Sequence, residues 1–297
     1  MFKYAITGAS GFLGKALVRE LVKHQGDRLL ILTRKGTKGV HSDSETLVDM
    51  ETLLKNEQGY NAQVLFHLAW EGVQNIYKNE TIQYTNHTLT EQVCLCAKKL
   101  GVKKIIALGS QAEYGIKNQR ISEEENLNPI TLYGKEKVKA FYFLKKFCEE
   151  NHIIYQWMRL FSAYGPHDHP GWFIPSVITK IIKGESPKLT AGDQVWDYLY
   201  VEDAAQALMQ VSELNSSDTY NLGSGQGVKI REIALMIQNL INLNVPCLFG
   251  EQPYSKDQIY HLQANISKLV SSTGWRPRVD LKEGLIKTIV FYKNLLS

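Results

Sequence analysis

The first fourteen residues constrain the fold more than any other stretch of the chain. Residues 2–7 (FKYAIT) are typical of a short buried strand, residues 15–23 of an amphipathic helix, and Gly8, Gly11 and Gly14 stand between them. A strand that runs directly into a helix leaves unpaired N–H groups at the positive end of the helix dipole, and this arrangement attracts phosphate. The glycine spacing in this context predicts a dinucleotide-binding turn. The residues between the glycines are predicted to line the same cofactor site: Ser10, Phe12 and Leu13.

Strand-like and helix-like patterns alternate after this turn. Apolar runs of strand length occur at 28–33, 64–68 and 104–108, and a helical pattern over 80–100 ends at a glycine. This alternation predicts an α/β fold, a Rossmann-type doubly wound parallel sheet that binds ligands beyond the carboxyl ends of its strands. We expect residues 1–160 to form an NADP-binding domain. Residues 161–297 should form mainly a smaller, interleaved substrate-binding lobe, with the segment at about 195–225 returning to the first domain.

Composition excludes several classes of function. With 44% hydrophobic and 22% charged residues the chain has the make-up of a soluble globular protein, and no apolar run approaches the roughly 20 residues that cross a bilayer. The net charge of +4 comes from scattered Lys and Arg, which does not indicate nucleic acid. Because a strand begins at residue 2 and the four cysteines lack metal-ligand spacing, we expect a cytoplasmic protein with reduced thiols, neither secreted nor bound to a membrane.

The end of the second predicted strand bears on the choice of cofactor. Arg34 follows that strand, and no acidic residue occurs between Arg28 and Val40. In dinucleotide folds an acid at this point binds the ribose 2′-hydroxyl of NAD, whereas an arginine accommodates the 2′-phosphate of NADP. Arg34 therefore predicts NADP(H), with NAD as the alternative. Further cofactor contacts are expected at the ends of the third and fourth strands, at Asp49, Met50, Leu68 and Ala69; His67, inside the fourth strand, is interpreted as a core histidine.

A serine, a tyrosine and a lysine are the candidates for the chemistry. Ser110 follows the strand at 104–108, while Tyr133 and Lys137 are four residues apart on one face of a predicted helix that runs to about residue 150. A phenol has a pKa near 10, and a nearby ammonium favours its ionised form. Ser110 can donate a hydrogen bond to a substrate carbonyl. Together these residues predict a proton relay beside a nicotinamide.

The same predicted helix holds a second Tyr-x-x-x-Lys pair, Tyr142 with Lys146. Because Tyr133 and Tyr142 are nine residues apart, they lie on opposite faces of the helix and only one can face the cofactor. Tyr142 stands among three phenylalanines, so we assign the chemistry to Tyr133 and packing, in the core or in an interface, to Tyr142.

Several motifs, taken in order, resemble those of the extended short-chain dehydrogenases/reductases of the NAD-dependent epimerase/dehydratase type: GASGFLG, VLFHLAW, LGSQAEYG, Tyr133-x-x-x-Lys137, RLFSAYGP and DYLYVEDAAQA. YNLGSG at 220–225 and TGWRP at 273–277 extend the resemblance over nearly the whole chain. The subgroup comprises nucleotide-sugar epimerases, dehydratases and 4-ketoreductases. The resemblance implies Ser110, Tyr133 and Lys137 as catalytic residues, Asn86 beside the nicotinamide, and a nucleotide sugar as substrate. Such relatives often dimerise through paired helices, which by analogy gives the aromatic face around Tyr142 a place in a homodimer.

Departures from the family pattern narrow the reaction. The 4,6-dehydratases of the family have Asp and Glu after the catalytic Ser or Thr, where this chain has Gln111 and Ala112, which carry no protons. The fucose-synthase type has a Cys beyond its Ser, and none follows Ser110. Family epimerases usually hold NAD permanently, whereas Arg34 suits a released NADPH. The leading prediction is NADPH-dependent reduction of a 4-keto-6-deoxy nucleotide sugar, and the alternative is a nucleotide-sugar 4-epimerase with tightly bound NAD.

The predicted substrate contacts lie at strand ends and in the second half of the chain. Ser162 replaces an Asn that holds the sugar or diphosphate in many relatives, and Trp196 and Tyr254 replace two arginines of the usual diphosphate clamp. His167-Asp168-His169 has no third ligand in view, so no metal site is expected. The full predicted set is Trp70, Ser110, Gln111, Ser162, Trp172, Lys180, Trp196 and Tyr254.

Overall fold

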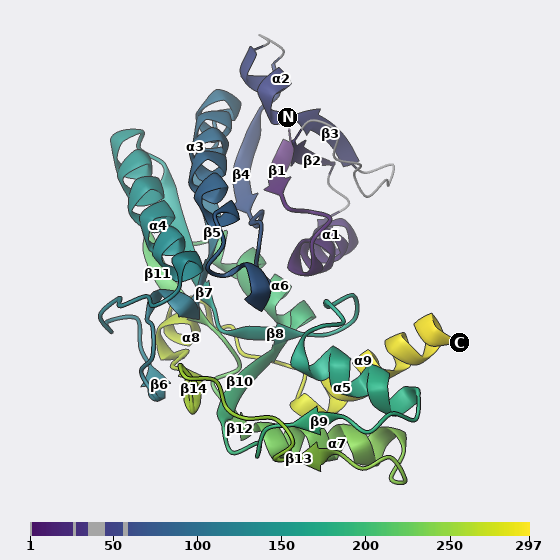
Figure 1. The fold of residues 1–297 in the computed structure, drawn as a ribbon. Coiled ribbons are helices and arrows are strands. Elements are labelled where there is room, and N and C mark those ends of the chain that lie inside the picture. The colour runs from purple at the N-terminus through teal and green to yellow at the C-terminus, as the bar shows by residue number, and fades with distance from the viewer. Residues whose placement is uncertain (1, 26–27, 35–44, 56–58) are drawn as a thin grey trace.

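The computed structural model describes residues 2–25, 28–34, 45–55 and 59–297. Within these residues, seven parallel strands form one sheet in the order β11-β7-β5-β4-β1-β2-β3 (Figure 1). The chain direction across the sheet reverses at β1, the topological switch point at which open α/β sheets bind ligands. The strands are β1 Phe2–Thr7, β2 Leu29–Thr33, β3 Glu45–Asp49, β4 Ala62–His67, β5 Lys104–Ser110, β7 Ile154–Leu160 and β11 Asp218–Leu222.

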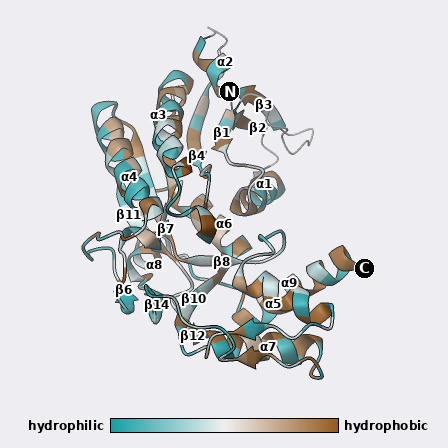
Figure 2. Ribbon diagram, viewed as in Figure 1, coloured by the Kyte–Doolittle hydropathy of each residue, from teal (hydrophilic) through white to brown (hydrophobic). Residues whose placement is uncertain are grey.

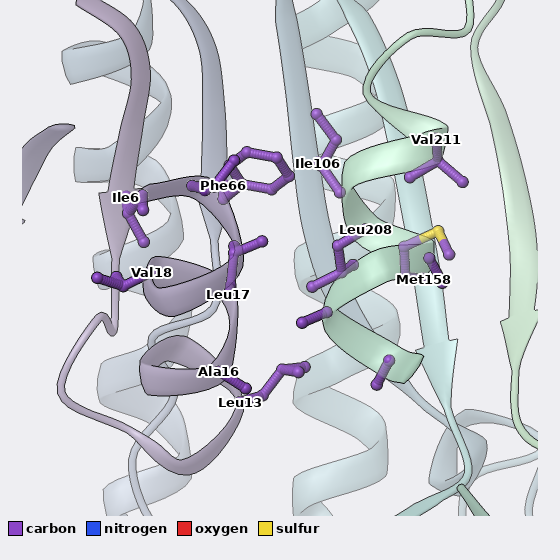
Figure 3. Close-up of a cluster of buried hydrophobic side chains, with 14 of the residues drawn as sticks. Ile6, Leu13, Ala16, Leu17, Val18, Phe66, Ile106, Met158, Leu208 and Val211 are labelled. Carbon is purple, nitrogen blue, oxygen red and sulfur yellow. The ribbon is translucent and has the colours of Figure 1, made fainter. Parts of the chain in front are cut away.

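Helices cover both faces of this sheet, which explains why strands such as β2 (LLILT) are apolar throughout. On one face, α1 (Phe12–Gln25) and α6 (Val201–Val211) pack against each other and against the strands (Figure 3). On the other face lie α2 (Met50–Lys55), α3 (Ile82–Leu100) and α4 (Leu132–Glu150). The first core includes Ile6, Leu13, Leu17, Phe66, Ile106, Met158, Leu208 and Val211.

A second, smaller group of elements is built mainly from the C-terminal part of the chain. Its helices are α5 (Phe173–Ile182), α7 (Ile230–Ile241) and α9 (Leu281–Leu296), which enclose a separate core around Ile178, Ile233 and Leu285. Figure 2 shows brown apolar and teal polar residues alternating along these helices, as expected where one face is buried. The remaining elements are β6 Gln119–Ile121, β8 Ser162–Tyr164, β9 Lys188–Leu189, β10 Val195–Tyr200, β12 Gly227–Lys229, β13 Leu248–Phe249, β14 His261–Ala264 and α8 Ser267–Thr273.

The sheet confirms the predicted fold class. β10, at 195–200, belongs to the sheet of the second group, whereas α6 and β11 at 201–222 pack with the seven-stranded sheet. The third strand ends at Asp49, as predicted, and α3 ends at Gly101, whose φ of 67° is left-handed. Tyr142 is 56% exposed, so core packing of its side chain was wrong, and its place in an interface stays a prediction. No helix within the described residues is long and apolar enough to cross a membrane.

Candidate active site

The glycine turn after β1 has the close packing that its spacing predicts. Gly8 has a φ of 74°, and a Cβ at this position would lie 2.6 Å from the Ala69 nitrogen. A Cβ at Gly14 would collide with the carbonyl oxygen of Gly8. The Gly11 N–H donates to that same oxygen (3.0 Å), which closes the turn in front of α1. Only glycine fits at positions 8 and 14. The turn therefore exposes backbone at the start of α1, an arrangement that suits a pyrophosphate.

The ends of β2, β3 and β4 meet beside this turn. Asp49 pairs in register with Thr33, and its Oδ1 accepts hydrogen bonds from the N–H and hydroxyl of Thr52 (2.9 and 3.0 Å). Its Oδ2 is buried and has no partner within the described residues. Such an acceptor suits an amino group, as carried by adenine, and with the glycine turn it fits a dinucleotide. Next to Asp49, Met50 is buried in the core under α2.

Arg34 is exposed at the end of β2 and forms an ion pair with Glu71, which follows β4. The sequence predicts Arg34 as the partner of a 2′-phosphate, but it gives no sign of this carboxylate, which lies 37 positions further along the chain. The residues that follow Arg34, 35–44, lie outside the described residues. At the adenosine end of the site, the positive charge of Arg34 is therefore partly neutralised by Glu71.

Ser110 ends β5 and is fixed by a capping box. Its hydroxyl accepts from the Ala112 N–H (3.1 Å), and its own N–H donates to Glu113 Oε1 (2.7 Å). The Glu113 carboxylate is fully buried and also accepts from Trp157 Nε1 (3.0 and 3.1 Å) and Arg159 Nε (2.8 Å). Sequence reasoning missed Glu113, although Ser-x-x-Glu is a recognisable capping-box pattern. The Glu113 carboxylate thus fixes the backbone of Ser110.

Tyr133 lies in the first turn of α4, which Thr131 caps by accepting from the Gly134 N–H (3.1 Å). Its hydroxyl is hydrogen-bonded to that of Ser110, as the predicted relay requires. Burial raises the pKa of Tyr133 to about 12, with the Ser110 hydrogen bond acting in the opposite direction and the Glu113 charge adding to the rise. The phenol is therefore protonated at neutral pH unless a nearby cation stabilises its ionised form.

Lys137 is buried one helical turn further along α4. Its Nζ donates to the carbonyl oxygen of Leu108 (2.6 Å) and lies 3.6 Å from the ring centroid of Trp70 and 6.0 Å from that of Tyr133. Burial lowers the pKa of Lys137 to about 7, and the charge of Glu113 acts in the opposite direction. The structure thus brings together Ser110, Tyr133 and Lys137, the three predicted catalytic residues.

The loop after β4 carries several predicted contacts and is held by side chains of α3. Asn86 is buried: its Oδ1 accepts from the Glu71 N–H (2.7 Å) and its Nδ2 donates to the Glu71 carbonyl oxygen (3.1 Å). Trp70 Nε1 donates to Gln83 Oε1 (3.0 Å). The amide of Asn86 is thus engaged by the loop, and its contact with the nicotinamide stays a prediction. Leu68 and Ala69 lie in the same loop, directly over Gly8.

His67 is a core histidine, as predicted. Its Nδ1 is hydrogen-bonded to the Thr7 hydroxyl (2.9 Å) and its Nε2 to that of Thr90 (3.3 Å). Burial, with the charge of Lys137, lowers the pKa of His67 to about 3, so it is neutral at physiological pH. It supports the site without a charge of its own.

The predicted substrate residues are more dispersed. Gln111 follows Ser110 and has a buried Oε1 without a partner in the described part of the chain, and Ser162 begins β8. The Trp196 ring stacks on Tyr198 (6.3 Å), whose ring in turn faces Phe173 (6.3 Å), next to Trp172 at the start of α5. Trp196, Tyr198 and Phe173 therefore form one aromatic run, and Trp172 is adjacent to it in sequence.

Two predicted substrate residues lie apart from this run. Lys180 is in the last turn of α5, about 12 Å along the helix from Trp172. The Tyr254 hydroxyl accepts from the Asp193 N–H (3.2 Å). Among His, Cys, Asp and Glu side chains, the described residues contain no group of three that could hold a metal ion. At His167-Asp168-His169, the ring of the first residue packs on Phe291 and the carboxylate of the second accepts from the third residue's N–H.

A glycine turn of the kind that binds phosphate, at the switch point and next to a hydrogen-bonded Ser–Tyr pair and a buried lysine, defines an NAD(P)-dependent oxidoreductase of the short-chain type. Comparison with known proteins agrees. Residues 4–223 match the NAD dependent epimerase/dehydratase family, and the chain belongs to this family.

Curated relatives span nearly the whole chain. The dTDP-glucose 4,6-dehydratase of Salmonella typhimurium is 28% identical over 98% of this chain and 92% of its own length. The UDP-glucose 4-epimerase of Lactobacillus helveticus is 26% identical (96% and 95% covered), and so is the dTDP-4-dehydro-6-deoxyglucose reductase of Escherichia coli (96% and 95% covered). Among solved structures, the UDP-glucose 4-epimerase of Thermotoga maritima, in complex with UDP-glucose, has a TM-score of 0.90 at 23% identity, covering 99% of this chain and all of its own.

Proposed function

We propose that this enzyme is a nucleotide-sugar 4-epimerase, which oxidises and re-reduces C4 of the sugar with a bound nicotinamide dinucleotide. The observation that carries the proposal is the hydrogen bond between the hydroxyls of Ser110 and Tyr133, beside a glycine turn that admits a pyrophosphate. Sequence analysis favoured a reductase; we now prefer the epimerase because 4-epimerases recur among both the sequence relatives and the solved structures of the same fold.

Each of the three proposed catalytic residues has a separate role in the reaction. A nicotinamide dinucleotide held at the glycine turn would supply reversible hydride transfer at C4, with the hydride returned to the opposite face of the sugar. Tyr133 takes the proton of the sugar hydroxyl during oxidation and gives it back during reduction, while Ser110 holds the C4 oxygen by a hydrogen bond. Tyr133 is a phenolate before it takes this proton and again after it gives the proton back, and the ammonium of Lys137 lowers the free-energy cost of that phenolate. Gln111 and Ala112 carry no proton for eliminating water, which argues against a dehydratase.

The cofactor is expected to contact the glycine turn with its pyrophosphate and the Asp49–Met50 segment with its adenine. Gly8, Gly11 and Gly14 leave room for the pyrophosphate, and the unpaired Oδ2 of Asp49 can accept a hydrogen bond from the adenine amino group. The site residues on the substrate side are Trp70, Gln111, Ser162, Trp172 and Trp196.

The second candidate is the NADPH-dependent 4-keto-6-deoxy nucleotide-sugar reductase. Arg34, with no acid between positions 28 and 40, favours it because an arginine accommodates the 2′-phosphate of NADP. Its partner Glu71 reduces the charge available for that phosphate, which favours NAD.

Cofactor stoichiometry separates the two candidates. Protein purified without added nucleotide is denatured and the released cofactor identified; native protein is then incubated with UDP-glucose, with UDP-galactose and with keto-sugar nucleotides plus NADPH. An epimerase releases NAD and interconverts the two UDP-hexoses without net consumption of reduced cofactor. Stoichiometric NADPH oxidation with a keto sugar, and no interconversion, would establish the reductase instead.

A further inference from the structure

The ammonium of Lys78 lies near two aromatic rings of the proposed substrate site. Its Nζ is 5.8 Å from the ring centroid of Tyr133 and 5.9 Å from that of Trp172. Tyr133 belongs to the sheet half of the molecule, whereas Trp172 precedes α5 of the second group. The ammonium of Lys78 thus lies within 6 Å of ring centroids on both parts of the chain.

The position of Lys78 is set by its backbone. Its carbonyl oxygen accepts a hydrogen bond from the Tyr133 N–H (2.8 Å), and the side chain of the next residue, Asn79, accepts from the Leu132 N–H (3.0 Å). These two bonds satisfy N–H groups in the first turn of α4 that have no partner within the helix. Because the same turn carries the catalytic phenol, the origin of the Lys78 side chain is fixed relative to that phenol.

The charge of Lys78 has no compensating acid. Within the described residues its ammonium forms no ion pair and donates no hydrogen bond. Partial burial lowers the pKa of Lys78, and no charged neighbour acts in the other direction. Two aromatic rings at nearly 6 Å attract a cation only weakly, so the ammonium remains available to an anionic ligand. Lys137, in the same region, differs because it donates to a backbone carbonyl.

We propose that Lys78 binds a negatively charged group of the substrate, a phosphate or a carboxylate, beside the reacting carbon. The inference rests on the proposed function, because it takes the ligand to be a nucleotide sugar. The inference also addresses the missing positive charge for the diphosphate. Trp196 and Tyr254 replace the usual diphosphate-binding arginines, and Lys180 lies at the far end of α5 from Trp172. Lys78 supplies a cation where those residues supply none. Lys78 lies in a segment that sequence reasoning passed over, because no periodic pattern or motif marks it.

The test measures binding, without turnover, to the cofactor-loaded enzyme. Titration calorimetry with inorganic pyrophosphate, UDP-glucose and UDP-glucuronate compares the wild-type chain with Lys78→Met, Lys78→Arg and Lys183→Met. The last is a matched control, since Lys183 is an exposed lysine next to α5. Lys78→Met should weaken binding by about 10- to 100-fold, as loss of a charge-assisted hydrogen bond does; Lys78→Arg should recover most of it, and Lys183→Met should change little. Thermal unfolding of each variant reports whether the fold is intact.

The pattern of losses identifies the anion. Equal losses for pyrophosphate and both UDP sugars identify the diphosphate, whereas a loss confined to UDP-glucuronate identifies a carboxylate on the sugar. Folded Lys78→Met protein that binds every probe within twofold of the wild-type affinity overturns the inference. If the wild-type chain binds pyrophosphate in a Lys78-dependent way but neither UDP sugar, the proposed substrate class fails while the anion site stands. A wild-type chain that binds none of the probes overturns both.

Discussion

The two ends of the proposed cofactor site are built differently. At the reaction end, Ser110 and Lys137 are buried, and Glu113 lies behind them with four hydrogen bonds to its carboxylate. At the adenosine end, Arg34 is exposed and its one described ion pair is with Glu71, whose side chain is partly exposed as well. Charges at the first end interact in a low dielectric, whereas those at the second are screened by water.

This difference predicts how each end responds to change. A buried polar group that loses its partner costs its full desolvation, so substitutions at the reaction end should have large effects on rate or stability. An exposed ion pair contributes little, so substitutions at the adenosine end should adjust cofactor preference and leave the fold intact. Residues at the reaction end should determine the reaction rate, and residues at the adenosine end should determine the relative affinity for NAD and NADP.

The largest effect is expected for Tyr133→Phe. The ring and its packing against Trp70 (6.0 Å) remain, but the proton relay is lost, and we expect turnover to fall by about 10²- to 10⁴-fold. Steady-state rates, together with calorimetric binding of cofactor and UDP-glucose, test this. Binding should change by less than about threefold. A variant that turns over at the wild-type rate would remove Tyr133 from the mechanism.

The next effect concerns Glu113. Glu113→Ala leaves the guanidinium of Arg159, a residue that is 4% exposed, without its carboxylate, and we expect the free energy of unfolding to fall by about 3–5 kcal/mol. Glu149→Ala is the control, because its pair with Lys145 (3.9 Å) is exposed and should be worth less than about 1 kcal/mol. Urea unfolding monitored by circular dichroism measures both. Equal losses for the two variants would contradict the contrast drawn between buried and exposed charges.

A third prediction concerns pH. Because burial lowers the pKa of Lys137 to about 7 from its ordinary 10.5, the unfolded chain binds more protons than the folded chain between these values. The contribution of Lys137 to folding stability therefore rises with pH from about 7 to 10.5. The contribution of its ammonium to catalysis falls over the lower part of the same range.

Urea unfolding at pH 7 and pH 9, beside a pH–rate profile, separates the two trends. Lys137→Met should remove the share of the stability increase that Lys137 contributes. If the wild type and this variant gain stability equally between pH 7 and 9, the lowered pKa of Lys137 is wrong.

These residues also show what the sequence could predict. The glycine turn, the alternating strands and helices, and the Tyr133–Lys137 spacing are local patterns, and each was recognised because its physical cause lies within a few neighbouring residues. The strand order then places the ends of β1, β4 and β5 together. Packing of α4 against β5 and against the turn at 111–113 brings Tyr133 to Ser110.

Interactions between side chains that are distant in the sequence could not be predicted from it. Glu113 binds Arg159 46 residues away, and Lys78 meets Tyr133 through a contact 55 positions apart. Neither pair has a periodicity or a motif that links its two members. Such contacts depend on how loops pack over the strand ends, and this is decided by the assembled fold.

The smallest predicted effect lies at the adenosine end, in the ion pair between Arg34 and Glu71. With side chains 52% and 33% exposed, the pair is worth at most about 1 kcal/mol, or roughly a fivefold change in an equilibrium constant. Glu71→Gln releases Arg34 and should shift the ratio of NADPH to NADH affinity toward NADPH by up to that factor, whereas Arg34→Gln should shift it toward NADH. The loop itself should not move, because Asn86 holds Glu71 through backbone atoms that the substitution leaves unchanged. Fluorescence titration with both nucleotides measures the ratio. Weaker NADPH binding by Glu71→Gln would mean that the carboxylate contacts the cofactor directly, and Arg34 would then no longer be the residue that sets the preference.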